Sequence, residues 1–501
     1  MDPFWVMDLD PTACFRAFAT RDERLDGRLF GGVVTTGIYC RPVCPARKPR
    51  PENVRFFSSA AAAQHAGFRP CLRCRPETAP ELGAWNGTAN TVSRALALID
   101  LGALDDGDMQ DLAGRLGVGE RHLRRLFQEH LGASPVAVAQ TRRLHMARRL
   151  IRETGLSMSE VALASGFGSL RRFNEAFRAA CGRTPSSLRR RPGAEAGLED
   201  GVTLRLAYRP PYDWPRMLDF FAQRQVAGVE RIEGPAYVRT LAVGGVAGVV
   251  RVEPGRGDTL SASLWFPDLR VLPRVLAQVR RVFDLALDPE PVLAHLGEDP
   301  DLAPLLAQRP GLRAPGAWDG FELAVRAILG QQVSVTAARG LAGRLAERHG
   351  LRLDFEPARR FGLDRLFPGP ERLADIDPES LPMPRARGRA LAAIAQLALE
   401  DGQLFGPGQD LESAVRRLTA LPGVGAWTAQ YIAMRAMREP DAFPHSDLAL
   451  LRAAADPEGR RPSPEALLAR AEAWRPWRAY AAAHLWAKDA DAASHRKGHP
   501  E

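Results

Sequence analysis

Apolar residues recur every three or four positions between about residue 88 and residue 188, which predicts a helical region. DMQDLAGRLGVGERHLRRLFQEHLG reads as a short helix, a turn at 117–119 and a second helix. LSMSEVALASGFGSLRRFNEAFRAACG repeats this order with a turn near 165–168. A long helix over 135–152 would join the two units. The apolar residues expected to dock the second helix of each unit are Leu123, Leu126, Phe127, Phe173 and Phe177.

The pattern changes after RPGAEAGLEDG, a small, polar and glycine-rich stretch that is typical of a linker. Apolar and polar residues alternate in AYVRTLAVGGVAGVVRVE and TLSASLWF, which predicts strands, whereas VLPRVLAQVRRVF has the spacing of a helix. Over the next 200 or so residues the helical spacing dominates again. The second half of the chain is therefore expected to be an α+β region followed by an all-α region.

Length and composition indicate a soluble protein of three or four domains. The chain has 501 residues, of which 45% are hydrophobic and 25% charged, and a formal net charge of +9. A basic balance suits a polyanionic partner, although a well-solvated basic surface would give the same charge. The start, MDPFWVMDLD, lacks the layout of a signal peptide, and no apolar run is long enough to span a bilayer. We expect a cytoplasmic protein without a membrane partner.

Four of the six cysteines are grouped in two close pairs, Cys40 and Cys44 in CRPVC and Cys71 and Cys74 in CLRC. Short spacing lets one turn present two sulfurs to the same ion, and the intervening stretch can close the second pair over it. This layout predicts a tetrahedral four-cysteine Zn²⁺ site. Redox-active thiols and plain buried thiols are the alternatives.

The segment VVTTGIYCRPVCPARKPRPENVRFF, followed by AGFRPCLRCRP, resembles the N-terminal domain of the Ada-type methyltransferases over most of residues 1–80. The resemblance implies that Cys40 takes a methyl group from a methylphosphotriester in DNA, with Cys44, Cys71 and Cys74 as the remaining zinc ligands. Zinc keeps sulfurs as thiolates, which are the nucleophilic form. Losing one thiolate charge on methylation would strengthen DNA binding, so we expect an irreversible electrostatic switch. A purely structural zinc knuckle is the alternative.

The tandem helix-turn-helix region resembles the AraC-type DNA-binding domain, most closely in ASGFGSLRRFNEAFRAACGRTPSSLRR, although Leu188 stands where that family commonly has tyrosine. Such units would enter successive major grooves of double-stranded DNA at promoter sites, about 34 Å apart. RNA polymerase is then a candidate partner, and we expect a monomer because no dimerisation segment is evident. The arginines expected to face DNA are Arg121, Arg124, Arg125, Arg171, Arg172 and Arg178.

A helix-hairpin-helix motif is indicated by LPGVGAWTAQYIAMRAM, where Leu421, Gly423 and Gly425 form the turn between two helices. Glycines there free backbone N–H groups to bind a DNA phosphate without reading sequence. DAFPHSDLALLRA follows and places Asp447 at the start of a helix. An aspartate at that position is more often a plain helix cap, and the hairpin upstream is what favours a catalytic role.

Residues 202–490 resemble the DNA-3-methyladenine glycosylase II family, and this resemblance implies that Asp447 is the catalytic carboxylate. The enzyme would flip an alkylated purine into a pocket, and the carboxylate would stabilise the positive charge that develops on the sugar. Aromatic faces would attract a cationic base. The resemblance also assigns the DNA wedge to Gln332, where leucine is common in the family. The implied pocket residues are Phe220, Trp427, Tyr431 and Trp486.

The glycosylase II family is part of the helix-hairpin-helix glycosylase superfamily, and two absences restrict the chemistry expected within it. Lyase members carry a hairpin lysine where this chain has Trp427, and no lysine occurs between Lys48 and Lys488. A monofunctional glycosylase is therefore expected. No cysteine follows Cys181, which excludes an iron–sulfur cluster and the O6-methylguanine transferase domain of full-length Ada-type proteins.

The expected fold is multidomain, mainly α with α+β parts. It comprises a zinc methyltransferase domain (1–82), an AraC-type DNA-binding domain (83–191), a linker (192–201), an α+β TBP-like domain (202–290), an all-α helix-hairpin-helix domain (291–490) and a tail (491–501). The leading hypothesis is one chain that senses, regulates and repairs alkylation damage. One alternative is a transcription regulator with an inactive glycosylase half. Another is a glycosylase whose first two domains only target it to DNA.

Overall fold

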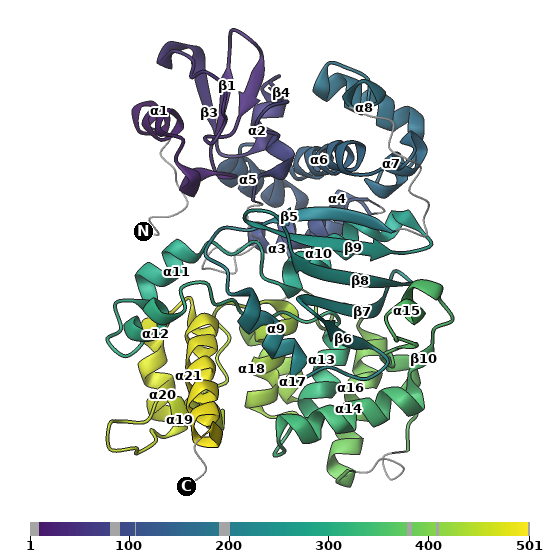
Figure 1. Ribbon diagram of the computed structural model, residues 1–501, viewed down its shortest axis with the longest axis vertical. Coiled ribbons are helices and arrows are strands. Elements are labelled where there is room, and N and C mark those ends of the chain that lie inside the picture. The colour runs from purple at the N-terminus through teal and green to yellow at the C-terminus, as the bar shows by residue number, and fades with distance from the viewer. Residues whose placement is uncertain are drawn as a thin grey trace.

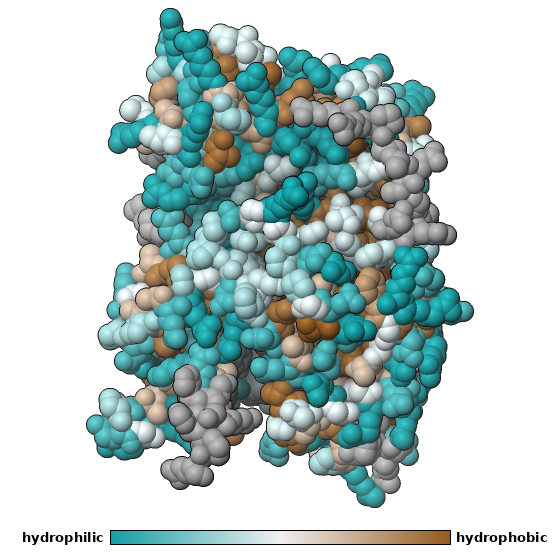
Figure 2. All heavy atoms as spheres, viewed as in Figure 1, coloured by the Kyte–Doolittle hydropathy of each residue, from teal (hydrophilic) through white to brown (hydrophobic). Residues whose placement is uncertain are grey.

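The computed structural model describes residues 10–80, 91–105, 107–189, 201–377, 383–406 and 410–498. Figure 1 shows the N-terminal part and the helix-turn-helix region at one end, the C-terminal helices at the other, and an antiparallel sheet between them. Hydrophilic side chains cover most of the face in Figure 2, with apolar residues scattered among them. Apart from Gly201, the predicted linker lies outside the described residues. Within these ranges, no helix is long and apolar enough to cross a membrane.

The N-terminal part contains a four-stranded sheet of order β3-β1-β2-β4, in which β2 and β4 are parallel and the other pairs antiparallel. Its elements are α1 (Pro11–Thr20), β1 (Phe30–Val33), β2 (Ile38–Cys40), β3 (Val54–Phe57), α2 (Ala60–His65) and β4 (Arg69–Pro70). In the parallel pair, Tyr39 lies opposite Pro70. Cys40 ends β2 and Cys71 directly follows β4, so this register brings the two cysteine pairs together.

Six α-helices lie within the described residues 91–105 and 107–189 of the helix-turn-helix region, and both predicted units are present. They are α3 (Thr91–Asp100), α4 (Met109–Arg115), α5 (Glu120–Leu131), α6 (Pro135–Glu153), α7 (Met158–Ala164) and α8 (Leu170–Cys181). α5 and α8 are the second helices of the two units, and α6 is the predicted joining helix. Each second helix ends at a glycine with left-handed backbone, Gly132 at φ 65° and Gly182 at φ 66°.

A five-stranded antiparallel sheet of order β5-β9-β8-β7-β6 forms the middle of the molecule. Alternate residues of β5 and β9 are buried, as the sequence pattern predicts for strands with one face in the core. The elements are β5 (Val202–Ala207), α9 (Trp214–Ala222), β6 (Glu230–Glu233), β7 (Ala236–Val243), β8 (Val246–Pro254), β9 (Thr259–Trp265) and α10 (Leu272–Val282).

The C-terminal part is helical, with one short two-stranded ribbon. The helices are α11 (Pro289–Leu296), α12 (Ala303–Gln308), α13 (Gly320–Leu329), α14 (Val335–His349), α15 (Glu356–Arg360), α16 (Arg385–Glu400), α17 (Leu411–Thr419), α18 (Ala426–Ile432), α19 (Leu448–Ala453), α20 (Pro464–Ala471) and α21 (Arg478–Gly498), and the ribbon pairs β10 (Leu351–Arg352) with β11 (Arg365–Leu366). α21 runs on through residues 491–498, which the sequence assigned to a tail. Asp491 on this extension pairs with Arg216 and Arg309.

The second helix-turn-helix unit and the central sheet share one apolar cluster. Phe173 and Phe177 of α8 belong to the same buried cluster as Leu204 and Leu206 of β5. α6 packs against β5, and α7 packs against the turn at Leu269–Val271 that precedes α10. The second helix-turn-helix unit and the sheet are therefore joined by buried apolar surface as well as by the chain itself.

α6 also holds the cysteine-bearing part through a buried ion pair. The Arg148 side chain is 1% exposed and lies 3.0 Å from the Glu77 carboxylate, which is fully buried. Arg148 also donates to the backbone carbonyls of Pro70 and Cys71 at 3.4 and 3.3 Å. Burial opposes ionisation of Glu77, but the Arg148 guanidinium holds the pKa of this carboxyl below its ordinary value.

Arg148→Met is therefore expected to destabilise the protein by about 3 kcal/mol, because it leaves the buried Glu77 carboxylate with only the half-buried Arg75, at 3.3 Å, as a cationic partner. Urea unfolding measures the loss. Arg148→Met combined with Glu77→Leu should recover part of it, because both charges are then removed. Equal stability of the single variant and the native protein would show that the ion pair contributes nothing.

Candidate functional site

The four paired cysteines come together in the N-terminal part as predicted. The sulfur atoms of Cys40, Cys44, Cys71 and Cys74 all lie within 4.8 Å of one another, and all four residues are buried. None forms a disulfide. Four buried thiols at this spacing fit the ligand set of a thiolate-preferring metal ion.

Two cationic side chains, Arg41 and Lys48, lie beside this cysteine cluster. The Arg41 backbone N–H donates to Cys74 Sγ at 3.4 Å, and its guanidinium reaches the Cys74 carbonyl at 3.0 Å and pairs with Asp26. The Lys48 ammonium lies 4.5 Å from the centre of the Phe18 ring, which packs in the cluster. Positive charge beside the sulfurs favours approach of a phosphate. Neither Arg41 nor Lys48 was predicted as a site residue, although both lie in the motif CRPVCPARK.

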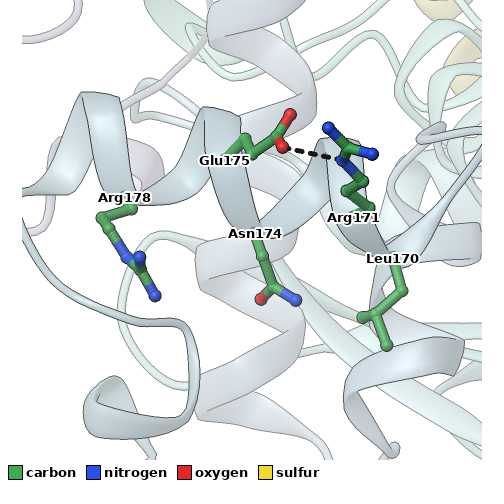
Figure 3. A pocket seen from close by; sticks show the side chains of 5 residues that line it. All are labelled: Leu170, Arg171, Asn174, Glu175 and Arg178. Carbon is green, nitrogen blue, oxygen red and sulfur yellow. Dashed lines mark hydrogen bonds and ion pairs between the residues drawn. The ribbon is translucent and has the colours of Figure 1, made fainter.

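The arginines predicted to face DNA are all exposed on the two second helices. Several are held by ion pairs along their own helix: Arg124 with Glu120 at 2.7 Å, Arg125 with Glu129 at 2.8 Å and Arg171 with Glu175 at 3.0 Å. Figure 3 shows Arg171 and Arg178 on α8 together with Leu170, Asn174 and Glu175, which line a hollow of about 420 Å³ on its solvent face. This face offers polar and apolar groups to a partner.

α17 and α18 form the predicted helical hairpin. Gly423 has φ +81°, and a Cβ added there would lie 2.9 Å from Ala390, so the turn requires glycine. Gly425 is the N-cap of α18, and Leu421 packs against the helical core. The Gln331 side chain donates to the Gly423 carbonyl at 2.9 Å and thereby joins the hairpin to the turn between α13 and α14.

Asp447 is the N-cap of α19, and four N–H groups hold its carboxylate. Oδ1 accepts from the backbone of Ala449 at 2.9 Å and Leu450 at 3.1 Å. The Trp486 indole donates to Oδ1 at 3.1 Å and the Trp427 indole to Oδ2 at 2.7 Å. The capping role and the predicted catalytic role therefore fall on one residue, and the two indoles fix the orientation of the carboxylate.

The four predicted pocket aromatics form a connected set beside Asp447. Trp427 and Tyr431 stack with ring centres 5.3 Å apart and planes at 8°. Trp486 meets Tyr431 edge-on at 6.2 Å. All four side chains, Phe220 included, are half-buried. Phe220 comes from α9 in the α+β region and joins the set through an arginine.

Two arginines that the sequence reading missed contact these rings. The Arg435 guanidinium lies 4.6 Å from the centre of Phe220 and donates to the Tyr431 hydroxyl at 2.6 Å. The Arg224 guanidinium lies 4.0 Å from the same Phe220 ring, and burial lowers its pKa to about 10. Phe220 thus already interacts with two cations of the protein itself. Each arginine follows an aromatic residue by four positions, Arg224 just beyond the end of α9 and Arg435 just beyond the end of α18, so this spacing could have indicated the contacts.

Gln332, the predicted wedge, is exposed in the turn between α13 and α14. Its backbone is left-handed, with φ +55°, which is uncommon for a residue other than glycine. Val333 and Val335 beside it are also exposed, at 36% and 42%. The turn therefore exposes one polar and two apolar side chains, and Gln331 next to them bonds to the hairpin at Gly423.

Comparison with protein families identifies three parts of the chain. Residues 13–77 match the metal-binding domain of Ada, residues 112–191 a helix-turn-helix domain, and residues 203–319 the AlkA N-terminal domain. These matches confirm the resemblances found in the sequence. They define a protein that joins a metal-binding Ada domain and a helix-turn-helix region to an AlkA-type domain.

Proteins similar to this chain over nearly its full length combine the same three parts. The chain is 43% identical to the probable bifunctional transcriptional activator/DNA repair enzyme AlkA of Mycobacterium tuberculosis, across 94% of this chain and 95% of that protein. It therefore belongs to the family of bifunctional AlkA proteins. DNA-3-methyladenine glycosylase 2 of Escherichia coli is 40% identical across 56% of this chain and 95% of its own length.

The fold of the second half is also seen in a solved structure. A 3-methyladenine DNA-glycosylase from Archaeoglobus fulgidus superposes with a TM-score of 0.51 and 24% identity, covering 57% of this chain and 97% of that one. At this identity the likeness concerns the fold.

Proposed function

We propose that this chain removes alkylated purines such as 3-methyladenine from duplex DNA by hydrolysing the N-glycosidic bond, with Asp447 as the catalytic carboxylate. The observation that carries this proposal is the Asp447 carboxylate, held by two indole and two backbone N–H groups beside the aromatic set. Family membership and the relatives named above support the same activity.

In this mechanism the hairpin turn binds a phosphate through its backbone N–H groups, and Gln332 occupies the gap left by the flipped nucleotide. The base enters beside Trp427, Tyr431 and Trp486, and Phe220, whose ring contacts Arg224 and Arg435, borders the pocket. Positive charge then develops on the sugar as the bond to the base breaks, and the Asp447 carboxylate stabilises it while water attacks. An alkylated base leaves readily because it already carries positive charge.

We further propose that the glycosylase is monofunctional. Trp427 occupies the hairpin position of the lyase lysine, and its indole bonds to Asp447. The Lys488 ammonium donates to the Ala453 carbonyl at 2.8 Å, at the end of α19 opposite to Asp447. We therefore expect base release from alkylated DNA without strand cleavage.

For the N-terminal part we propose repair of methylphosphotriesters in DNA with zinc as the metal. Cys40, Cys44, Cys71 and Cys74 would hold the ion, which keeps the sulfurs as thiolates when bound. Cys40 Sγ attacks the methyl carbon, so that an S–C bond forms, the C–O bond breaks and the phosphodiester leaves as an anion. Arg41 and Lys48 attract the phosphate backbone to the cluster.

The helix-turn-helix region would hold the protein, once Cys40 is methylated, on promoter DNA, where an activator acts on RNA polymerase. One chain carries both second helices, so a monomer can occupy two successive major grooves. The alternative, a regulator with an inactive glycosylase half, predicts DNA binding without base release.

Base release by the native protein, with Trp486→Phe as a variant, tests the glycosylase proposal. Phenylalanine keeps the ring but removes one N–H donor from Asp447, so we expect kcat to fall about tenfold or more with little change in KM. The assay quantifies free base and strand breaks from methylated duplex DNA.

Trp265→Phe is the matched control, because its buried indole N–H has no hydrogen-bond partner in the part of the chain that the structure describes. This variant should keep native kinetics. No base release by folded native protein would favour the inactive-glycosylase alternative, and an unchanged kcat in Trp486→Phe would remove the positioning role of the indole.

A further inference from the structure

The two second helices, α5 and α8, present the same positions to solvent but with different chemistry. Both have twelve residues and end at a left-handed glycine, so a shift of 50 residues aligns them. Their buried positions correspond, with Leu123 and Phe127 of α5 matching Phe173 and Phe177 of α8. Their exposed positions therefore correspond too, and can be compared one by one.

One row of side chains along the solvent side of α8 begins with an apolar residue and an amide, of which the first is exposed and the second half-buried. Leu170, Asn174 and Arg178 are four residues apart, and Figure 3 shows all three extending to one side of the helix. Leu170 is 41% exposed although it is a large apolar residue. Among the described residues the Asn174 amide has no hydrogen-bond partner, whereas neighbouring Arg171 is paired with Glu175.

The matching row on α5 consists of Glu120, Arg124 and Gln128. Glu120 and Arg124 form an ion pair at 2.7 Å, with side-chain exposures of 38% and 56%. The row therefore has a charged acceptor and a charged donor where α8 has an apolar group and a neutral amide. The N-terminal residues of such a helix are the ones that contact base edges in the major groove.

The chemistry of base edges separates the two rows. An asparagine amide can bond to the N6 and N7 edge of adenine, and an apolar side chain can contact the methyl group of thymine. An arginine pairs with the O6 and N7 edge of guanine, and a glutamate accepts from the N4 group of cytosine. Asparagine and an apolar side chain therefore fit A·T pairs, whereas arginine and glutamate fit G·C pairs.

We propose, resting on the DNA-binding role above, that α8 reads A·T pairs through Leu170 and Asn174, whereas α5 reads G·C pairs through Glu120 and Arg124. The target site is then asymmetric, with a G·C-reading segment and an A·T-reading segment about one helical turn apart. Arg121 of α5 and Arg172 of α8, beside the two rows, would contact the DNA phosphates and add affinity without sequence preference.

The test selects binding sites from randomised, undamaged duplex DNA with the full, zinc-loaded chain, both unmodified and after reaction with methylated DNA. Asn174→Arg gives α8 the side chain that α5 has at the matching position. It should change the preferred base at one position from adenine to guanine, with a discrimination of about tenfold or more. Leu170→Ala should weaken the preference for thymine at the adjacent position.

Ala179→Arg is the matched control, because it adds the same charge to α8 at an exposed position outside the row. It should raise affinity for all sequences and leave the preferred bases unchanged. All variants should keep native base release, which reports that they are folded.

Two results would count against the proposal. A native sequence preference that Asn174→Arg leaves unchanged would overturn the assignment of α8 while leaving the regulatory function intact. A native chain that selects no sequence in either state would contradict the regulatory function itself, and this inference with it.

Discussion

Asp447→Asn is expected to reduce base release at least about a hundredfold, which is the scale for losing a charge that stabilises the transition state. Asparagine has nearly the same size as aspartate but carries no negative charge to offer the sugar. It is also a good N-cap, so α19 should keep its start. Single-turnover release of 3-methyladenine from methylated duplex DNA measures the effect.

Asp410→Asn is the control for this substitution. Asp410 caps α17 by accepting from the Ser413 backbone at 2.9 Å, as Asp447 caps α19, but among the described residues no indole donates to its carboxylate. The control variant should release base at the native rate. If Asp447→Asn also did so, the charge at residue 447 would not take part in the chemistry.

Cys71→Ala is expected to abolish metal binding and to unfold much of the N-terminal part. Structural zinc sites contribute on the order of 10 kcal/mol to folding, and this part has little other core around its cysteines. Methyl transfer to Cys40 should disappear with the metal. Zinc content by elemental analysis, limited proteolysis and methyl uptake from alkylated DNA measure the three effects.

Cys14→Ala is the matched control, because Cys14 is buried but lies outside the four-cysteine cluster. It should keep one metal ion per chain and native methyl uptake. Cys40→Ala separates chemistry from structure further, since it should remove methyl uptake even where some metal remains bound. Retention of a full equivalent of zinc by Cys71→Ala would show that this cysteine is not a ligand.

Features that depend on residues close in the chain were predictable from the sequence. Spacing within CRPVC and CLRC indicated the metal ligands, because one turn can present two sulfurs. Apolar periodicity indicated the tandem helix-turn-helix units, and LPGVG indicated the hairpin turn that the left-handed Gly423 now explains. These signals survive because helix periodicity and turn geometry are local properties of the chain.

Contacts between distant residues were decided by tertiary structure alone. Trp486 donates to Asp447 from 39 positions away, and Arg148 pairs with Glu77 from 71 positions away. Neither pairing follows from any local pattern, since only the folded backbone sets which side chains meet. Tertiary structure also decided how the second helix-turn-helix unit packs. The sequence placed this unit and the central sheet in different domains, on either side of a linker at 192–201. The apolar residues of this unit are instead buried with those of β5, because helix and strand faces that would each be exposed alone cover one another.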